Sequence, residues 1–251
     1  MDNYTDITAC IVLYNENISD LENAVNSFLN ISNFTKHLFL VDNSPQQNLP
    51  LRLKNHPDVT YIFNNENLGF AKAQNLVIDK IKDSKYHLVL NPDVTFKPNI
   101  IQQLIETLRN KINVAVITPK IQFPNGKHQH NVRKYPTFFD LIIRKLKIFK
   151  SRIHEQEYRN EDLTKPFFPE AIHGCFMLFK TEDFVTLNGF DERYFLYMED
   201  IDICKKIDQI GKKKLYYPKV KVSHVLKQGS SKNIKLFLYH LSSAFKYFVK
   251  W

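Results

Sequence analysis

Apolar and polar positions alternate in two periods over the first 120 residues of the chain. Short runs rich in apolar residues are typical of buried strands, and they occupy residues 7–13, 37–42, 59–63, 86–90 and 114–118. Longer segments with apolar residues three or four positions apart predict helices, at 19–29, 69–81 and 99–109. Ser19 and Glu22 predict a capping box at the start of the first helix. Strands alternating with helices predict a mostly parallel sheet in an α/β fold.

The regular alternation ends after Pro119. The following residues, 119–136, carry proline, glycine and polar side chains, which is typical of a long loop beside an active site. Residues 153–168 are polar and predict a mobile segment. Further elements are predicted as a basic amphipathic helix at 137–152, a strand at 171–179, an acidic helix from about 199, one or two strands at 213–225 and a second basic amphipathic helix at 234–251.

Length and composition predict a globular protein. The 251 residues, 43% of them hydrophobic, suffice for one large α/β domain or two small ones. No apolar run approaches the roughly 20 residues that span a bilayer, and the N-terminus lacks the basic region of a signal peptide. We therefore expect a cytoplasmic protein. The three cysteines, Cys10, Cys175 and Cys204, lack CxxC spacing, so they are expected to be small buried hydrophobic residues rather than disulfide partners.

The net charge of +9 indicates a polyanionic partner. Nucleic acid, an anionic membrane surface and a phosphorylated substrate all satisfy this condition, and composition does not choose among them.

Polar residues follow four of the predicted strands, where ligands bind in open α/β sheets. Asp42 and Asn43 are placed to hydrogen-bond a base or a ribose, although Asp-Asn-Ser-Pro is also ordinary turn sequence. Gly69, before a helix, allows the backbone to approach a phosphate. The chain has no GxGxxG and no GxxxxGK(S/T) motif, so a dinucleotide site and a P-loop lack their main support.

Asp93 follows an apolar strand and a proline in "LNPD". Mg²⁺ and Mn²⁺ are often held by one or two carboxylates together with substrate phosphates, so a single Asp at this edge can hold a metal on a diphosphate. The alternative is a simple turn ahead of the next helix.

Seven segments occur in a recognisable order: "IVLYNE", "LVDNS", "NENLGFAKAQN", "LNPDV", "HGCFMLFK", "GFDERYFLYMEDIDICKK" and "VSHVLKQGSS". In this order and spacing, from about residue 7 to 231, the chain resembles family 2 inverting glycosyltransferases of the GT-A fold, and among them the rhamnosyltransferase type. The resemblance implies a Rossmann-like, mostly parallel central sheet flanked by helices. It also implies one continuous domain with a nucleotide-sugar-binding half at 1–120 and an acceptor-binding half with the catalytic base at 121–251.

The resemblance assigns residues to the donor and to a metal. Asp42 matches the residue that reads the nucleotide base, and Asp93 with His224 matches the ligands of Mg²⁺ or Mn²⁺. Asn91 stands where many relatives have the first Asp of the metal motif, which predicts modest metal affinity. The remaining donor-contacting positions are Tyr14, Asn15, Glu16, Asn43, Asn67, Gly69, Phe70, Asn75, His173 and Gly174.

The resemblance also identifies the base. Asp200 matches the carboxylate that deprotonates the acceptor hydroxyl, and Glu199 orients the acceptor or its loop. Taken without the resemblance, these carboxylates are equally explained as favourable residues for a helix N-terminus. Asp202 is expected to cap or pair on the helix, and one ring of Tyr194, Phe195 or Tyr197 is a candidate to stack on the acceptor sugar.

The expected function is transfer of L-rhamnose from dTDP-L-rhamnose to a glycan or a polyprenyl-diphosphate-linked acceptor in bacterial O-antigen or capsule synthesis. A UDP-hexose or UDP-galactofuranose donor is the near alternative. A nucleic-acid-binding module is disfavoured because the basic residues gather on predicted helices and not on a sheet face. A catalytically inactive sugar-binding relative is disfavoured by the retention of Asp93, Glu199 and Asp200.

The two basic amphipathic segments have two interpretations. They are composed like helices that lie on an anionic bilayer, or they pack on the domain or form a homodimer interface with a solvated charged face. With a lipid-linked acceptor, peripheral attachment to the cytoplasmic face of the plasma membrane is the prediction.

Overall fold

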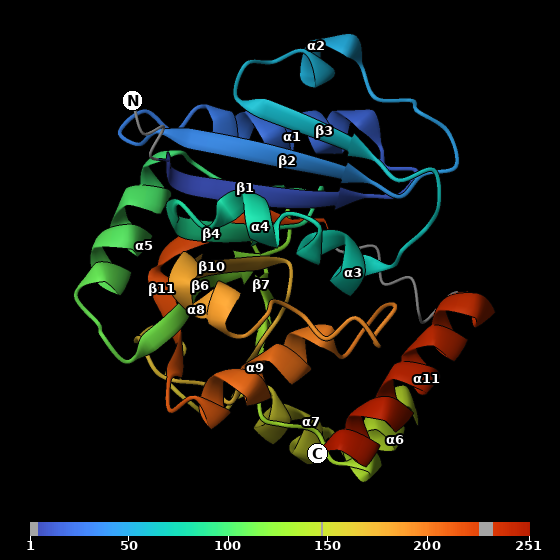
Figure 1. The fold of residues 1–251 in the computed structure, drawn as a ribbon. Coiled ribbons are helices and arrows are strands. Elements are labelled where there is room, and N and C mark those ends of the chain that lie inside the picture. Colours follow the sequence, from blue (N-terminus) through green and yellow to red (C-terminus); the bar gives the residue numbers. More distant parts are fainter. Residues whose placement is uncertain (1–4, 147, 226–232) are drawn as a thin grey trace.

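The computed structural model describes residues 5–146, 148–225 and 233–251, and it is built around a nine-stranded sheet (Figure 1). The strand order is β3-β2-β1-β4-β10-β6-β11-β5, with β7 paired to β6, and β8 and β9 form a separate pair. The strands are β1 (Thr5–Leu13), β2 (Lys36–Asp42), β3 (Val59–Phe63), β4 (Ser84–Leu90), β5 (Val94–Thr95), β6 (Val114–Gln122), β7 (His128–Gln129), β8 (Val132–Arg133), β9 (Ala171–Ile172), β10 (Phe176–Lys180) and β11 (Lys213–His224).

The sheet is parallel where the sequence predicts it to be. Strands β1 to β4 pair in parallel, and β6 pairs in parallel with β11. Strand β10 lies between β4 and β6 and is antiparallel to both. The predicted α/β fold with a mostly parallel central sheet is therefore confirmed, with one antiparallel strand in its centre.

Helices cover both faces of the sheet (Figure 1). Apolar side chains of α1 and α5, such as Phe28 and Leu104, belong to the core on one face, and those of α8 and α9, such as Phe184 and Ile203, belong to the core on the other. The helices are α1 (Ile18–Leu29), α2 (Leu51–Lys54), α3 (Phe70–Asn75), α4 (Ile78–Ile81), α5 (Asn99–Arg109), α6 (Phe138–Leu146), α7 (Lys150–Gln156), α8 (Thr181–Thr186), α9 (Glu199–Gln209) and α11 (Ile234–Lys250). No described helix has both the length and the apolar character needed to cross a bilayer.

The start of α1 differs from its predicted capping box. The helix begins at Ile18, and the Asn17 side chain accepts a hydrogen bond from the Asp20 backbone N–H at 3.1 Å. Glu22 pairs instead with Arg52. The box prediction was wrong because Asn17, an equally good N-cap, lies two residues earlier.

Three predicted elements are divided in the structure. The helix predicted at 69–81 is two short helices, α3 and α4, and the strand predicted at 171–179 is β9 and β10 separated by residues 173–175. The basic helix predicted at 137–152 is α6 and α7, with Phe149 between them at a φ of 50°. The one or two strands predicted at 213–225 are one long strand, β11, which ends at His224. Residues 153–168, predicted to be mobile, include the end of α7 and a backbone pairing of Phe167 with Tyr216.

Helix α3 and residues 189–195 meet in close backbone contact. The Phe70 N–H donates to the Phe195 carbonyl at 2.8 Å, and a Cβ on Gly69 would lie 2.3 Å from that oxygen. The Asn75 side chain bonds both the N–H and the carbonyl of Phe190, at 2.9 and 2.8 Å. At Gly189 a Cβ would lie 2.2 Å from Asn75 Oδ1. Two glycines therefore allow the segment that leads into α9 to lie against α3.

Gly69→Ala is expected to destabilise the protein by about 3 kcal/mol, because its φ of 80° and ψ of 175° favour glycine and the new Cβ would meet a backbone oxygen. The matched control is Gly126→Ala, at a φ of 81° with no atom within 4 Å of the added Cβ, for which we expect a loss of about 1 kcal/mol. Urea unfolding of both variants measures the difference, and equal losses would contradict the proposed importance of the contact.

Candidate functional site

Parallel pairing brings the carboxyl ends of β1 and β2 to one edge of the sheet, with Leu13 opposite Asp42. A cavity of about 280 Å³ lies at this edge. It is lined by Leu13, Asn15, Glu16, Ile18, Leu21, Asp42, Ser44, Asn48 and Leu49. Three of the predicted donor residues, Asn15, Glu16 and Asp42, therefore share one cavity, and the neighbouring Tyr14 is 48% exposed.

Asp42 is fixed in the wall of this cavity. Its carboxylate accepts hydrogen bonds from the Ser44 N–H at 2.8 Å and from the Tyr61 hydroxyl at 2.7 Å. Burial and the adjacent Asp42 raise the pKa of Tyr61, so this hydroxyl remains a donor at neutral pH. Asn15, at a φ of 52°, donates its N–H to the Ser44 hydroxyl at 2.9 Å. The strand end and the following loop are thus held in one geometry around the cavity.

The predicted donor residues around Gly69 are brought together, and their hydrogen bonds hold the loop itself. Asn43 donates from Nδ2 to the Gly69 carbonyl at 3.1 Å and accepts from Asn64 at 2.8 Å. Asn67 Oδ1 accepts from the Gly69 N–H at 3.0 Å. Phe70 packs its ring on Phe190 at 5.8 Å. Asn75, also predicted to contact the donor, is directed to the backbone of Phe190.

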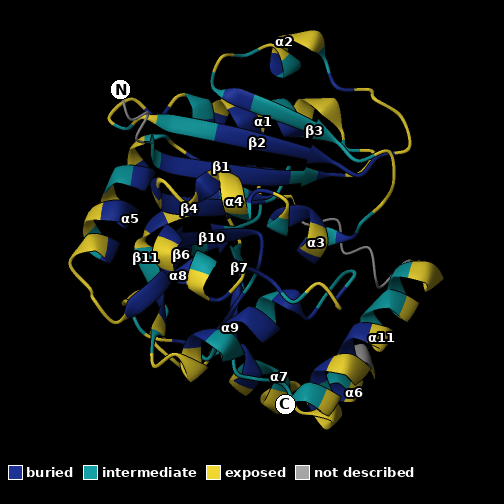
Figure 2. Ribbon diagram, in the orientation of Figure 1, coloured by how far each residue is buried: buried dark blue, intermediate teal, exposed yellow. Residues whose placement is uncertain are grey.

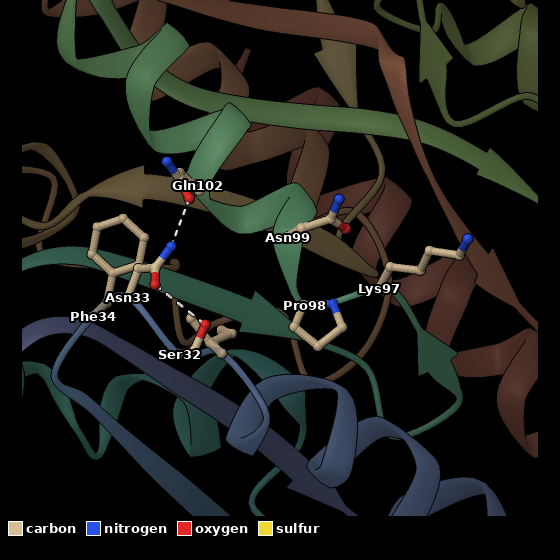
Figure 3. A pocket seen from close by; sticks show the side chains of 8 residues that line it. Ser32, Asn33, Phe34, Lys97, Pro98, Asn99 and Gln102 are labelled. Atoms are coloured by element: carbon tan, nitrogen blue, oxygen red, sulfur yellow. Dashed lines mark hydrogen bonds between the residues drawn. The ribbon is translucent and has the colours of Figure 1, made fainter.

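A larger cavity of about 460 Å³ lies elsewhere, between the loop before β2 and the start of α5 (Figure 3). Its lining residues are Ile31, Ser32, Asn33, Phe34, Lys97, Pro98, Asn99 and Gln102. Asn33 spans it by donating to Gln102 at 2.8 Å. Since it contains none of the predicted site residues, we do not assign it to the candidate site.

Asp93 and His224 meet although 131 positions separate them in the sequence. Antiparallel pairing of β5 with β11 places His224 opposite Val94, and His224 Nε2 lies 3.3 Å from Asp93 Oδ1. The other ring nitrogen, Nδ1, is 2.6 Å from Gln129 Oε1. Asn91 lies beside them, and its backbone N–H donates to the Cys175 carbonyl at 3.0 Å.

The Asp93 and His224 pair fits a shared divalent ion. Ligands at about 2.1 Å on neighbouring octahedral positions lie about 3 Å apart, close to the observed separation of 3.3 Å. In the described part of the chain no group of three or more His, Cys, Asp or Glu residues is arranged to hold a metal. An ion held by this pair would take its other ligands from water, amide or carbonyl oxygens, or a bound phosphate.

Cys175 lies in contact with His173 and His224. Burial lowers the pKa of His224, but Cys175 and Asp93 offset this effect and raise it to about 10. Burial raises the pKa of Cys175, and the two histidines bring it down to about 6. All three cysteines are buried as predicted, but no sequence pattern indicated that one of them contacts both histidines. A metal ion would have to displace the proton of His224, because histidine ligates as the neutral ring.

Residues 173–175 also contact the acidic helix. The Gly174 N–H donates to Asp200 Oδ2 at 3.0 Å, and a Cβ on Gly174 would lie 3.2 Å from that of Asp200. Asp200 Oδ1 accepts from the Ile201 N–H at 2.9 Å. One short connection between β9 and β10 therefore touches both the predicted base and, through Cys175, the predicted metal ligand His224.

Glu199 is a buried carboxyl group at the first position of α9. Burial raises the pKa of Glu199 well above its usual value, and the charges of Asp200 and Asp202 add to this effect. Within the described residues its Oε2 has no hydrogen-bond partner. The two preceding residues, Tyr197 and Met198, have φ values of 69° and 68°. Glu199 is thus held as a buried, preferentially neutral acid at the end of a strained turn.

Asp202 does not cap its own helix; it binds the other end of the chain. Its Oδ1 accepts from Lys250 Nζ at 2.7 Å, Trp251 Nε1 at 2.8 Å and the Tyr194 hydroxyl at 3.1 Å. The sequence did not reveal Lys250 and Trp251 as partners because they lie 48 and 49 positions away, at the end of α11.

The three candidate stacking rings divide between core and surface. Tyr194 is 1% exposed, whereas Phe195 and Tyr197 are partly exposed and pack on Tyr239 and His240 at ring distances of 4.5 and 5.1 Å.

Sequence comparisons match two family models. The model "Glycosyl transferase family 2" matches residues 8–184, and the model "N-terminal domain of galactosyltransferase" matches residues 158–227. The chain is similar to rhamnosyltransferase WbbL of Escherichia coli (strain K12), with 30% identity over 191 residues, 72% of this chain and 70% of that protein. It is 25% identical over 201 residues to N-acetylglucosaminyl-diphospho-decaprenol L-rhamnosyltransferase of Mycobacterium tuberculosis (strain ATCC 25618 / H37Rv), covering 74% of this chain and 66% of that protein.

Two solved structures share the fold at low sequence identity. One is GalNAc-T7 with UDP, GalNAc and Mn²⁺, with a TM-score of 0.66, 20% identity, and coverage of 89% of this chain and 43% of that chain. The other is the mannosyltransferase PcManGT of Pyrobaculum calidifontis with GDP-Man and Mn²⁺, with a TM-score of 0.63, 16% identity, and coverage of 98% and 65%. These likenesses confirm the GT-A fold.

Glu199→Gln is expected to change how stability depends on pH. Because the pKa of Glu199 is raised in the folded protein, the protein loses stability as the pH rises above about 4.5, the ordinary value, toward the folded-state pKa. The uncharged variant lacks this loss, so its free energy of unfolding should rise relative to that of the wild type between pH 5 and pH 8. Denaturant unfolding at both pH values measures this, with the exposed Glu161→Gln as control. Parallel pH profiles for wild type and Glu199→Gln would contradict the raised pKa.

Proposed function

Because the chain belongs to glycosyl transferase family 2, we propose that it moves a sugar from a nucleotide-sugar donor to an acceptor hydroxyl, with inversion at the anomeric carbon. One observation carries the proposal. Residues 173–175 contact Asp200, the proposed base, and also His224, which lies 3.3 Å from Asp93. The proposed proton acceptor and the proposed site for the charged leaving group therefore contact the same short connection.

The donor half is proposed to bind the nucleotide at the cavity at the end of β1 and β2. Asp42 is fixed there by Ser44 and Tyr61, as a residue must be if it is to distinguish one base from another. We propose that residues 1–120 form the donor-binding half and residues 121–251 the acceptor-binding half. The other proposed donor-contacting residues are Tyr14, Asn15, Glu16, Asn43, Asn67, Gly69, Phe70, Asn75, Asn91, His173 and Gly174.

Asp93 and His224 are the proposed ligands of Mg²⁺ or Mn²⁺. When bound, the ion supplies positive charge for the departing diphosphate. Two of the fold relatives were solved with Mn²⁺. The neutral amide of Asn91 in place of a carboxylate and the protonated His224 both work against tight binding, so we propose that substrate phosphates complete the site.

Asp200 is the proposed general base. It takes the proton of the acceptor hydroxyl while the hydroxyl oxygen forms its bond to the anomeric carbon and the bond to the diphosphate breaks on the opposite side. The raised pKa of Glu199 favours its neutral form, which donates a hydrogen bond and adds no second negative charge beside the base. We assign Glu199 to orienting the acceptor.

The donor and the acceptor are proposed from the relatives. Two of them are named as rhamnosyltransferases, and the mycobacterial name includes a decaprenol-linked diphosphate. We propose dTDP-L-rhamnose as donor and a polyprenyl-diphosphate-linked saccharide or glycan as acceptor, in O-antigen or capsule synthesis at the inner face of the plasma membrane. A UDP-sugar is the second candidate donor, because a fold relative was solved with UDP.

Nucleotide binding is expected to depend on metal. In isothermal titration with dTDP, UDP and GDP, one nucleotide should bind at least tenfold more tightly with Mn²⁺ than without, because an ion held by Asp93 would supply positive charge to the phosphates. Asp93→Asn should lose this gain, whereas the matched control Asp83→Asn, on an exposed residue, should keep it. Preference for dTDP supports a rhamnosyl donor, whereas preference for UDP assigns a UDP-sugar as the donor. Failure of all three nucleotides to bind would refute the donor site.

Asp200→Asn is expected to lower kcat by about 10³-fold, since general base catalysis contributes about 10² to 10⁴. Nucleotide affinity should remain within twofold of wild type, because Asp200 lies on the acceptor side. Initial-rate transfer assays on a lipid-diphosphate saccharide measure kcat, and isothermal titration measures nucleotide affinity. Asp83→Asn is the control in both. If the variant keeps wild-type kcat, another residue is the base.

A further inference from the structure

Helices α6 and α11 each expose a stripe of large apolar side chains. Because a helix turns about 100° per residue, the five residues of α11 lie within about 80° of one another and the four of α6 within about 100°. We call these residues the α6–α11 face: Phe138, Phe139, Ile142, Leu146, Ile234, Leu238, Leu241, Phe245 and Val249, each 40–73% exposed. Exposed turns of both helices are visible in Figure 2.

The stripes do not point into the protein core. The buried residues of α11 are Ser243, Ala244 and Tyr247, which lie on the other side of the helix from Leu238 and Phe245. On α6 the buried residues are Asp140 and Ile143. The two helices lie side by side (Figure 1), and the Phe138 and Phe248 rings are 5.9 Å apart. The fold therefore gathers two apolar stripes, from segments almost 100 residues apart, at one place on the surface.

The two segments that carry this face are rich in positive charge, although Arg144 and Lys250 pair with carboxylates. Residues 137–152 carry five Lys and Arg against one acidic residue, and residues 233–251 carry three Lys and none. The net charges of +4 and +3 make up most of the chain's +9. The single carboxylate, Asp140, is buried and paired with Arg152. Lys235 is exposed next to Ile234. An apolar stripe with flanking cations and no exposed acidic residue in these two segments complements the surface of an anionic bilayer.

We infer that the α6–α11 face docks the protein peripherally on a membrane of anionic lipids, with the apolar stripes at the level of the acyl-chain boundary. Charge decides between this occupant and a second copy of the chain. Two copies joined through this face would bring together two surfaces of the same strong positive sign. Anionic headgroups instead attract each Lys and Arg at the surface.

Docking has a consequence for catalysis, which rests on the function proposed above. The inner side of α11 contacts the residues on either side of Glu199 and Asp200. Ser243 donates to the Leu196 carbonyl at 2.8 Å, and Lys250 and Trp251 bind Asp202 in the first turn of α9. The helix that lies on the bilayer is thus the helix that contacts the residues leading to Glu199 and Asp200. A lipid-linked acceptor would meet the base from the membrane side.

Vesicle co-sedimentation of the full chain tests the inference. Wild type should bind vesicles of phosphatidylcholine mixed with phosphatidylglycerol at least tenfold more strongly than pure phosphatidylcholine, and high sodium chloride should weaken the binding. The double variant Leu238→Ser, Phe245→Ser should bind at least tenfold more weakly. The matched control is Leu51→Ser, Ile112→Ser, whose side chains are 71% and 82% exposed on other elements and whose binding should remain within twofold.

The outcomes separate docking from the transferase function. Titration with nucleoside diphosphate on the same variants should match wild type, because the donor cavity is on another part of the fold, and this also establishes that they are folded. No preference for anionic vesicles, or equal binding by both double variants, overturns the docking inference and leaves the transferase proposal standing. A dimer in sedimentation equilibrium that Leu238→Ser, Phe245→Ser dissociates, without vesicle binding by wild type, assigns the face to a second copy and likewise overturns it.

Discussion

The contact between α3 and residues 189–195 is the constraint on which the candidate site depends. The Phe70 N–H bonds the Phe195 carbonyl, Asn75 bonds both backbone groups of Phe190, and two glycines leave the room for this approach. The proposed donor cavity lies at the ends of strands β1 and β2, whereas the acidic residues begin α9. This contact holds the residues before Glu199 against α3, and the turn that follows includes two left-handed residues, Tyr197 and Met198.

Three carboxylates in one helical turn would repel one another if all were charged and unpaired. Each has a different environment. Asp202 is buried against Lys250 and Trp251, Asp200 accepts two backbone N–H groups, and Glu199 is buried without a cation, which raises its pKa. These different environments fit a structural role for Asp202 and the basic and acidic roles proposed for Asp200 and Glu199. A favourable helix N-terminus accounts for none of these differences.

The hydrophobic pattern predicted the first half of the fold well, because parallel strands buried on both faces leave uninterrupted apolar runs. It also placed Asp42 and Asp93 at strand ends, where the structure has them. It did not reveal that β10 inserts antiparallel between β4 and β6, nor that His224 reaches Asp93, because strand order depends on long-range pairing that no local period encodes. The resemblance supplied that link. Neither approach found the contact of Lys250 and Trp251 with Asp202, or of Cys175 with the histidines.

Helix α11 links a basic, apolar surface of the chain to its proposed catalytic residues. Composition alone left nucleic acid, membrane and phosphorylated substrate equally open. The two segments that carry the exposed apolar stripes, 137–152 and 233–251, also carry much of the net positive charge. No Lys or Arg is among the described residues that line the proposed donor cavity. Nucleic acid binding would instead require cations interleaved with aromatic rings along a groove. A helix with an apolar outer stripe and an inner side bonded to Asp202 is more simply understood as joining a lipid surface to the acceptor side of the site.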